Sequence, residues 1–264
     1  MGGRVLLWDS TLRDTREAMG EPRSDKRNLE IVGQLARAGV AETVVVSPDH
    51  VAEDIRFSRR VKAEGFGITL SGQVHANSPN TEAEIEKTIE VLDRVDLLMP
   101  LSEQKPPVGS ARKISVLLEA LDFARSRSTQ VGVGFLYATE ASPLFLLEIV
   151  QRTTRAGAQR ITLYDTTGEA EPFSLRTMLE ELIAEVGVPV FFHAHDHLGL
   201  AVANSWAAVL AGARGLGGSI QGLRDGVGNA SLEEVAELLG RYKIPTGVDA
   251  SELAKLGPLL DTTE

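Results

Sequence analysis

The sequence predicts an α/β protein folded as a (β/α)8 TIM barrel, and three observations lead to this fold class. Eight short apolar runs alternate with longer amphipathic stretches along the 264 residues. Most of these runs are apolar on both faces, as parallel strands covered by helices are. No GxGxxG turn or phosphate-binding loop follows the first run, which disfavours the alternative, an open doubly wound sheet.

The strand candidates are spread over nearly the whole chain. In order they are RVLLWDS, ETVVVSP, FGITLSGQVH, VDLLMPLS, QVGVGFLYA, RITLYDTTG, PVFFHAH and ARGLGGSIQG. Residues 113–126 and 231–240, by contrast, place apolar side chains at helical spacing. No Pro-, Gly- or Ser-rich linker divides the chain, so we expect residues 1–245 to form one barrel domain. Residues 246–264 are expected to form a short helical tail, either a cap on the barrel or the start of an incomplete lid.

The composition excludes several classes of protein. The net charge of −10 opposes binding to nucleic acid, because phosphates would be repelled. The chain has no cysteine, so disulfides, thiolate ligands and cysteine nucleophiles are excluded. The first ten residues, MGGRVLLWDS, lack the pattern of a signal peptide, and no apolar run is long enough to span a membrane. We therefore expect a soluble cytoplasmic protein.

The stretch HAHDHLGLAVANS, residues 193–205, contains three of the five histidines at every second position. Side chains two apart share one face of a strand, and the preceding PVFF is typical of a strand. This spacing alone leaves a metal site and an exposed histidine-rich strand end equally open. We expect the strand to end near Asp196, because Gly199 and the following helical pattern require a turn. His197 should then leave the shared face, and Asp196 should point away from it.

Polar residues follow most of the predicted strands, at the end of the barrel where such proteins carry their chemistry. A solvated loop surface also collects polar residues. It does not account for an HxH pair, an Arg-Asp dipeptide and a DTTG turn on one face. The residues concerned are Asp9, Arg13, Asp14, His75, Glu140, Thr166, His193, His195 and Asn229.

Four motifs, in this order, resemble those of the DRE-TIM metallolyase superfamily. They are DSTLRD at 9–14, YDTTG at 164–168, HAHDHLGLAVAN at 193–204 and GLRDGVGNASLEEV at 222–235. This family contains the isopropylmalate, homocitrate and citramalate synthases, HMG-CoA lyase and the 4-hydroxy-2-oxoacid aldolases. The alternation of predicted strands and helices extends the resemblance over almost the whole chain.

The resemblance implies a divalent metal ion, Mg²⁺, Mn²⁺, Zn²⁺ or Co²⁺, with Arg13 as the catalytic arginine and Thr166 as a holder of a substrate carboxylate. The metal ligands that it implies are Asp14, His193, His195 and Asn229. Two imidazoles, one carboxylate and one amide leave open positions on an octahedral ion, where a 2-oxo acid can chelate. The metal then polarises the keto group, and the guanidinium stabilises the developing oxyanion.

Plainer interpretations compete for some of these residues. The Arg13–Asp14 dipeptide is also compatible with a surface ion pair. Asn229 is also placed to cap a helix that begins near Ser231. For Asp9, we expect a supporting hydrogen-bonding role rather than metal binding.

The remaining site residues are less specific. His75 stands where many relatives have arginine, so we expect it only to line the substrate pocket. Glu140 is one candidate for the general base; the alternative is a residue from a partner subunit or a lid. The chain departs from the family's usual motif residues at Thr15 and Glu17, which follow TLRD. It also departs at His197, where relatives have an acidic residue.

We therefore expect an acyl-CoA-dependent Claisen condensation onto a 2-oxo acid, by a homodimer or a subunit of a larger assembly. The alternative is a retro-aldol or retro-Claisen lyase, although the missing cysteine disfavours an orthodox HMG-CoA lyase. The sequence of the loop GGSIQGLRDGVGNA is most similar to that of the corresponding loop in the synthases. Two further alternatives are a non-catalytic metal-binding barrel and an amidohydrolase, whose HxH pair would belong on the first strand rather than the seventh.

Overall fold

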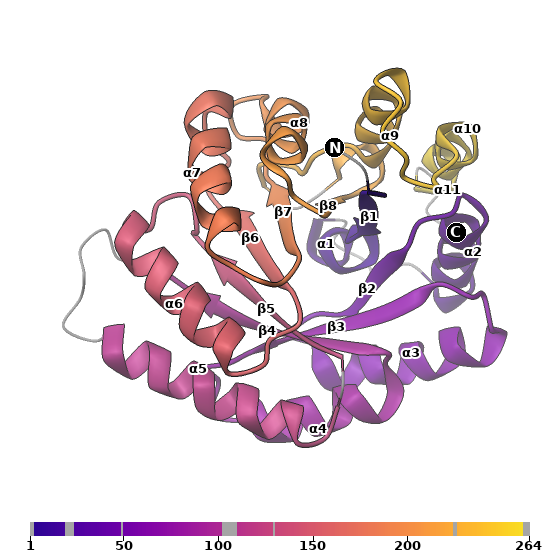
Figure 1. The fold of residues 1–264 in the computed structure, drawn as a ribbon. Helices are drawn as coiled ribbons and strands as arrows, with labels where there is room; N and C mark the ends of the chain where they lie inside the picture. The colour runs from indigo at the N-terminus through magenta and orange to yellow at the C-terminus, as the bar shows by residue number, and fades with distance from the viewer. Residues whose placement is uncertain are drawn as a thin grey trace.

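The computed structural model describes residues 3–18, 24–48, 50–101, 110–128, 130–223 and 226–260. Its eight strands form a closed barrel in the order β1 to β8, with helices around the outside (Figure 1). Neighbouring strands are parallel throughout, and β8 pairs with β1 to close the barrel. The predicted fold class is confirmed.

Seven of the eight strands fall inside the apolar runs of the sequence, and β4 begins one residue before its run, at Arg94. Their bounds are β1 Leu6–Asp9, β2 Glu42–Val46, β3 Thr69–His75, β4 Arg94–Pro100, β5 Val131–Leu136, β6 Ile161–Asp165, β7 Val190–Ala194 and β8 Gly215–Gly218. Because the strands are parallel, their carboxyl ends meet at one end of the barrel. That shared end is where the predicted site residues belong.

The helices follow the strands in turn. Their bounds are α1 Thr11–Ala18, α2 Asp25–Arg37, α3 Val51–Glu64, α4 Thr81–Val91, α5 Ser110–Arg125, α6 Pro143–Arg155, α7 Pro172–Ala184, α8 Ala201–Ala211, α9 Leu232–Arg241, α10 Ala250–Leu253 and α11 Gly257–Leu260. The helical spacing seen at 113–126 and 231–240 corresponds to α5 and α9. The last two helices, α10 and α11, pack against α2 and bury Leu253 and Leu260.

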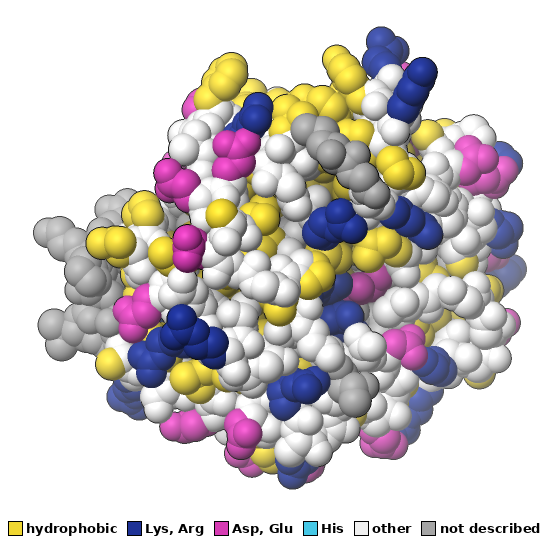
Figure 2. Space-filling view, in the orientation of Figure 1, with side chains coloured by type: hydrophobic (Ala, Val, Ile, Leu, Met, Phe, Trp, Pro, Cys, Tyr) yellow, Lys and Arg dark blue, Asp and Glu magenta, His cyan; other side chains and the backbone are white. Residues whose placement is uncertain are grey.

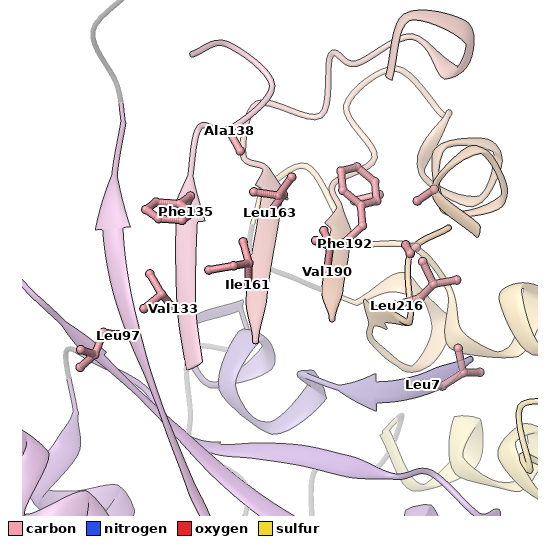
Figure 3. Close-up of a cluster of buried hydrophobic side chains, with 14 of the residues drawn as sticks. Leu7, Leu97, Val133, Phe135, Ala138, Ile161, Leu163, Val190, Phe192 and Leu216 are labelled. Atoms are coloured by element: carbon pink, nitrogen blue, oxygen red, sulfur yellow. The ribbon is translucent and has the colours of Figure 1, made fainter. Parts of the chain in front are cut away.

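Along β6 and β7, alternate side chains enter two separate layers. The main core lies between strands and helices and includes Leu163 of β6 and Phe192 of β7 (Figure 3). Their strand neighbours Tyr164 and Phe191 belong to a second, smaller cluster with Trp8. The alternation places this second cluster inside the barrel, so the barrel is filled by side chains.

A buried ionic network fills the barrel interior near the start of the strands. Arg160 donates to both carboxylate oxygens of Glu42, at 2.7 and 2.9 Å, and also to Asp96. Its guanidinium lies 4.8 Å from the centre of the Phe191 ring. These contacts join β2, β4, β7 and the entry to β6, so this network stabilises the end of the barrel opposite the predicted site.

Replacing Arg160 with methionine is expected to lower the free energy of unfolding by roughly 3–5 kcal/mol, because two buried carboxylates lose their nearest counter-charge. Arg94 remains, but it lies 3.8 Å from Glu42. Denaturant unfolding followed by circular dichroism measures the change. Arg176→Met is the matched control, because Arg176 forms an exposed ion pair with Glu180 at 2.7 Å. Such a pair contributes at most about 1 kcal/mol. Equal losses in the two variants would show that the buried network has no special role.

The outer surface mixes charges of both signs. In Figure 2, Lys and Arg side chains alternate with Asp and Glu over most of the face, while apolar side chains gather along its upper edge. Among the described helices, none combines the length and apolar character that crossing a membrane requires.

Candidate metal centre

Asp14 lies in the first turn of α1, directly after β1, and its carboxylate is held from two sides. One oxygen accepts from Nε and Nη2 of Arg13, both at 2.7 Å, and the other accepts from the Ser10 hydroxyl at 2.6 Å. Burial alone would raise the pKa of Asp14, but Arg13 and His193 lower it to about 2. The side chains of Arg13 and Asp14 are only 13% and 6% exposed, so the surface ion-pair interpretation is wrong.

Asn229 lies between Asp14 and one of the histidines. Its amide nitrogen donates to Asp14 at 2.7 Å and to the Ser219 hydroxyl at 3.1 Å. Its carbonyl oxygen is 3.2 Å from Nε2 of His193. The helix-capping interpretation of Asn229 is wrong, because the Ser231 hydroxyl caps α9 instead. Residues 215 positions apart in the sequence thus meet in one buried cluster.

The two histidines present their rings from the end of β7. His193 belongs to the strand, and His195 follows it and pairs with Asn229 in an isolated antiparallel bridge. Both rings are buried, with centroids 5.0 Å apart and planes at 87°. Nδ1 of His195 lies 2.8 Å from the Thr166 carbonyl oxygen, which can only accept, so Nδ1 carries the proton. Nε2 of His195 is then the nitrogen with a lone pair suited to a metal ion.

His197 leaves the shared face, as the sequence predicts. β7 ends at Ala194, and His197 lies exposed in the turn that precedes α8. The Asp196 carboxylate accepts from the Ala201 amide at 2.8 Å, at the start of α8. Gly168 lets the loop after β6 lie close to the loop after β7, since a Cβ at Gly168 would lie 2.7 Å from the backbone nitrogen of His197.

His197→Asn is therefore expected to bind divalent metal within a few-fold of the parent protein, because the exposed ring supplies no ligand. Isothermal titration with Mn²⁺ or Zn²⁺ measures the affinity, with His195→Asn as the matched change on the buried face. A loss in His197→Asn as large as that in His195→Asn would indicate a three-histidine site.

The Thr166 side chain reaches toward the end of β5. Its hydroxyl oxygen accepts from the Tyr137 amide at 2.7 Å, and Tyr137 has a left-handed backbone with φ of 59°. A hydroxyl group has one proton to donate as well as two lone pairs. Because the Thr166 hydroxyl oxygen already accepts from the Tyr137 amide, its proton is suited to donation to a substrate carboxylate.

Glu140 and His75 lie outside the hydrogen-bonded cluster. One Glu140 oxygen accepts from the Thr167 hydroxyl, beside Thr166. The other Glu140 oxygen is buried and accepts no hydrogen bond within the described part of the chain. His75 ends β3 with a half-buried ring that makes no hydrogen bond to a described residue. Of the loop after β8, Arg224 and Asp225 lie outside the described residues.

Asp9 is buried at the end of β1. It accepts from the Thr43 hydroxyl at 2.9 Å and from the Thr11 hydroxyl, which itself accepts from the Ile220 amide. Burial raises the pKa of Asp9 to about 7 against the lowering effect of these hydrogen bonds. These contacts connect β1, β2 and the segment after β8, close in sequence to Asp14.

Three buried side chains around the cluster have no role in the site predicted from the sequence. Trp8 stacks on His193 with ring centroids 5.1 Å apart, and Tyr164 lies 5.2 Å from the same ring. Gly217 leaves the space for the indole, because a Cβ there would lie 2.2 Å from Trp8. Gln73 contacts Arg13. A sequence signal existed for Gln73, a polar residue within an apolar run, two positions before His75.

The four predicted ligands do not form a preformed metal-binding site. Among the described residues, no group of three or more His, Asp or Glu side chains is close enough together to hold an ion. The reason is visible in the cluster, where the Asn229 amide separates Asp14 from His193. The donor types nevertheless fit a divalent ion. In the present arrangement His193 Nε2 faces the Asn229 carbonyl oxygen, which can only accept, at 3.2 Å. This nitrogen therefore carries a proton here, and His193 would bind an ion through it only after that proton has moved.

The chain belongs to the HMGL-like family, whose model matches residues 4–260. This confirms the resemblance to the DRE-TIM metallolyases. A 2-isopropylmalate synthase of Methylacidiphilum infernorum is 29% identical over 97% of this chain and 54% of its own length. Homocitrate synthase 1 of Nostoc sp. is also 29% identical, over 97% of this chain and 69% of its own length. The chain thus spans about half the length of the isopropylmalate synthases that it matches.

Solved structures share the same barrel. Hydroxymethylglutaryl-CoA lyase from Pseudomonas aeruginosa superposes with a TM-score of 0.79 at 23% identity, covering 97% of this chain and 92% of the lyase. The carboxyl transferase domain of Rhizobium etli pyruvate carboxylase gives a TM-score of 0.83 at 16% identity, covering 98% of this chain and 47% of that one. At these identities the likeness supports the fold alone.

Proposed function

We propose that this chain is a divalent-metal-dependent enzyme that adds the methyl carbon of an acyl-CoA to the keto carbon of a 2-oxo acid. One observation carries the proposal: Arg13, Asp14, His193 and Asn229 form a single buried cluster at the carboxyl end of the barrel. The names of the matched synthases support this chemistry.

Asp14, His193, His195 and Asn229 would hold the metal ion, which is Mg²⁺, Mn²⁺, Zn²⁺ or Co²⁺. When bound, the ion supplies Lewis acidity to the keto oxygen of the substrate. Asp14 is ready for this role, because its lowered pKa keeps the carboxylate charged at neutral pH. His195 is ready as well, since the Thr166 carbonyl sets its tautomer.

Arg13 and Thr166 act on the substrate oxygens. Burial alone would lower the pKa of Arg13, but Asp14 raises it overall, so the guanidinium stays charged. That charge stabilises the oxyanion that develops as the keto carbon is attacked. The Thr166 hydroxyl donates to the substrate carboxylate, and His75 lines the pocket at the end of β3.

Glu140 is the proposed base, through the oxygen that accepts no hydrogen bond from the described residues. It takes a proton from the acyl methyl group, and the resulting carbon forms a bond to the keto carbon. The keto oxygen takes the electron pair and is then protonated to a hydroxyl. Hydrolysis of the thioester, with addition of one water, releases the CoA thiol and a hydroxy diacid.

Release of free thiol from acetyl-CoA tests the proposal, with metal-loaded protein and a panel of 2-oxo acids. We expect thiol release with at least one acid and none after chelation of the metal. The runner-up is the reverse cleavage, because the same cluster stabilises the same oxyanion in either direction. Cleavage of 3-hydroxy acids or their thioesters without any condensation would establish that lyase. Metal binding without turnover in either panel would indicate a non-catalytic barrel.

A further inference from the structure

A neutral side chain holds Arg13 at a nitrogen that Asp14 does not contact. The carbonyl oxygen of Gln73, on β3, accepts from Nη1 of Arg13. The amide nitrogen of Gln73 donates to the Tyr164 hydroxyl, on β6, at 2.8 Å. Gln73 and Tyr164 are 1% and 3% exposed. We propose that Gln73, oriented by Tyr164, is the positioning residue that aims Arg13 at the reacting oxygen; this rests on the proposed role of Arg13.

The contact with Asp14 does not fix the guanidinium alone. Nε and Nη2 of Arg13 both donate to the same Asp14 oxygen, at 2.7 Å. A planar group held at one acceptor atom can pivot about that atom. The hydrogen bond from Nη1 to Gln73 adds a second acceptor at another corner of the plane, and two fixed points define the direction in which the remaining N–H groups point.

Tyr164 sets which end of the Gln73 amide faces Arg13. The two ends of an amide are nearly the same size, but one accepts and the other donates. Because the Tyr164 hydroxyl accepts from the amide nitrogen, the carbonyl oxygen turns toward Arg13. The phenol ring is itself confined, since it packs against His193 at 5.2 Å and against Trp8 at 6.4 Å between centroids.

The neutrality of Gln73 matters for the chemistry. A second carboxylate beside Arg13 would hold it equally well but would neutralise the charge offered to an oxyanion. An amide orients the guanidinium and leaves that charge available. Gln73→Leu should therefore free Arg13, whereas Gln73→Glu should keep it ordered and reduce its effect on the rate.

The kinetic experiment compares Gln73→Leu with Ser71→Ala. Ser71 is the matched control, because it is a buried polar residue of β3 whose hydroxyl meets the Thr43 carbonyl at 3.4 Å. We expect Gln73→Leu to lower kcat about 10-fold to 100-fold, as loss of orientation does, with KM and metal affinity within a few-fold. In an Arg13→Ala background, Gln73→Leu should lower kcat no further. An equally large fall in kcat from Gln73→Leu in that background would overturn the proposal. So would an equally large fall in kcat in Ser71→Ala.

A second measurement is independent of the reaction. The side-chain Nε–H signal of Arg13, assigned by its loss in Arg13→Lys, reports the order of the guanidinium by ¹⁵N NMR. We expect a sharp signal in the parent, Ser71→Ala and Gln73→Glu, and a broadened, fast-exchanging one in Gln73→Leu. If the parent turns over no substrate, the proposed reaction fails while this comparison still decides the role of Gln73. An unchanged Arg13 signal in Gln73→Leu would refute it.

Discussion

Replacing both His193 and His195 with alanine is expected to remove nearly all bound divalent metal from the purified protein. The two rings are buried at the end of β7, 5.0 Å apart, and His195 has its tautomer set by the Thr166 carbonyl. Without them, only the Asp14 carboxylate and the Asn229 amide remain of the proposed ligands. One carboxylate and one neutral amide are a weak pair for a borderline ion such as Zn²⁺.

Metal content per chain, measured by atomic emission after dialysis against a trace of the ion, checks this expectation. His50→Ala is the matched control, since His50 is 36% exposed and lies before α3, outside the cluster. We expect the control to retain the parental metal content. One ion per chain retained in the double variant would refute the assignment of the ligands.

The barrel itself was predictable because each of its elements is encoded locally. The run VGVGFL contains no polar side chain, which indicates a strand buried on both faces. The last three residues of ETVVV follow the same pattern. The end of β7 was also predictable in detail. Gly199 and the helical pattern after it require a turn, and the structure places His197 in that turn, exposed.

The cluster of Asp14, His193 and Asn229, proposed to bind metal, was predictable only by resemblance. Asp14 and Asn229 are hydrogen-bonded partners in space but lie 215 positions apart, and no local pattern connects them. The family motifs supplied that connection. The lack of a local pattern also explains why the sequence did not predict the buried ion pairs. Arg160 pairs with Glu42 and Asp96 only because closure of the barrel brings three strands together. Gln73 and Tyr164 likewise meet across the barrel interior, at 91 positions' separation.

Arg13→Lys is expected to lower the turnover rate on the order of 100-fold to 1000-fold, the usual effect of losing one oxyanion donor. The guanidinium contacts Asp14 through Nε and Nη2 and Gln73 through Nη1, so its plane is fixed. A lysine keeps the positive charge but is a single point of charge on a flexible stem. It can pair with Asp14, but it cannot also reach Gln73 and present a fixed N–H edge to the substrate.

Steady-state rates with the best 2-oxo acid measure this effect, together with metal affinity by titration. We expect metal affinity within a few-fold of the parent, because the lysine charge still keeps Asp14 ionised. Asp14→Asn provides the contrast: it should lose metal and rate together, since it removes the charged ligand itself. Near-normal turnover in Arg13→Lys would mean that Arg13 only supports Asp14. A loss of metal in Arg13→Lys as large as that in Asp14→Asn would mean that Arg13 acts on the reaction through the ligand rather than on the oxyanion.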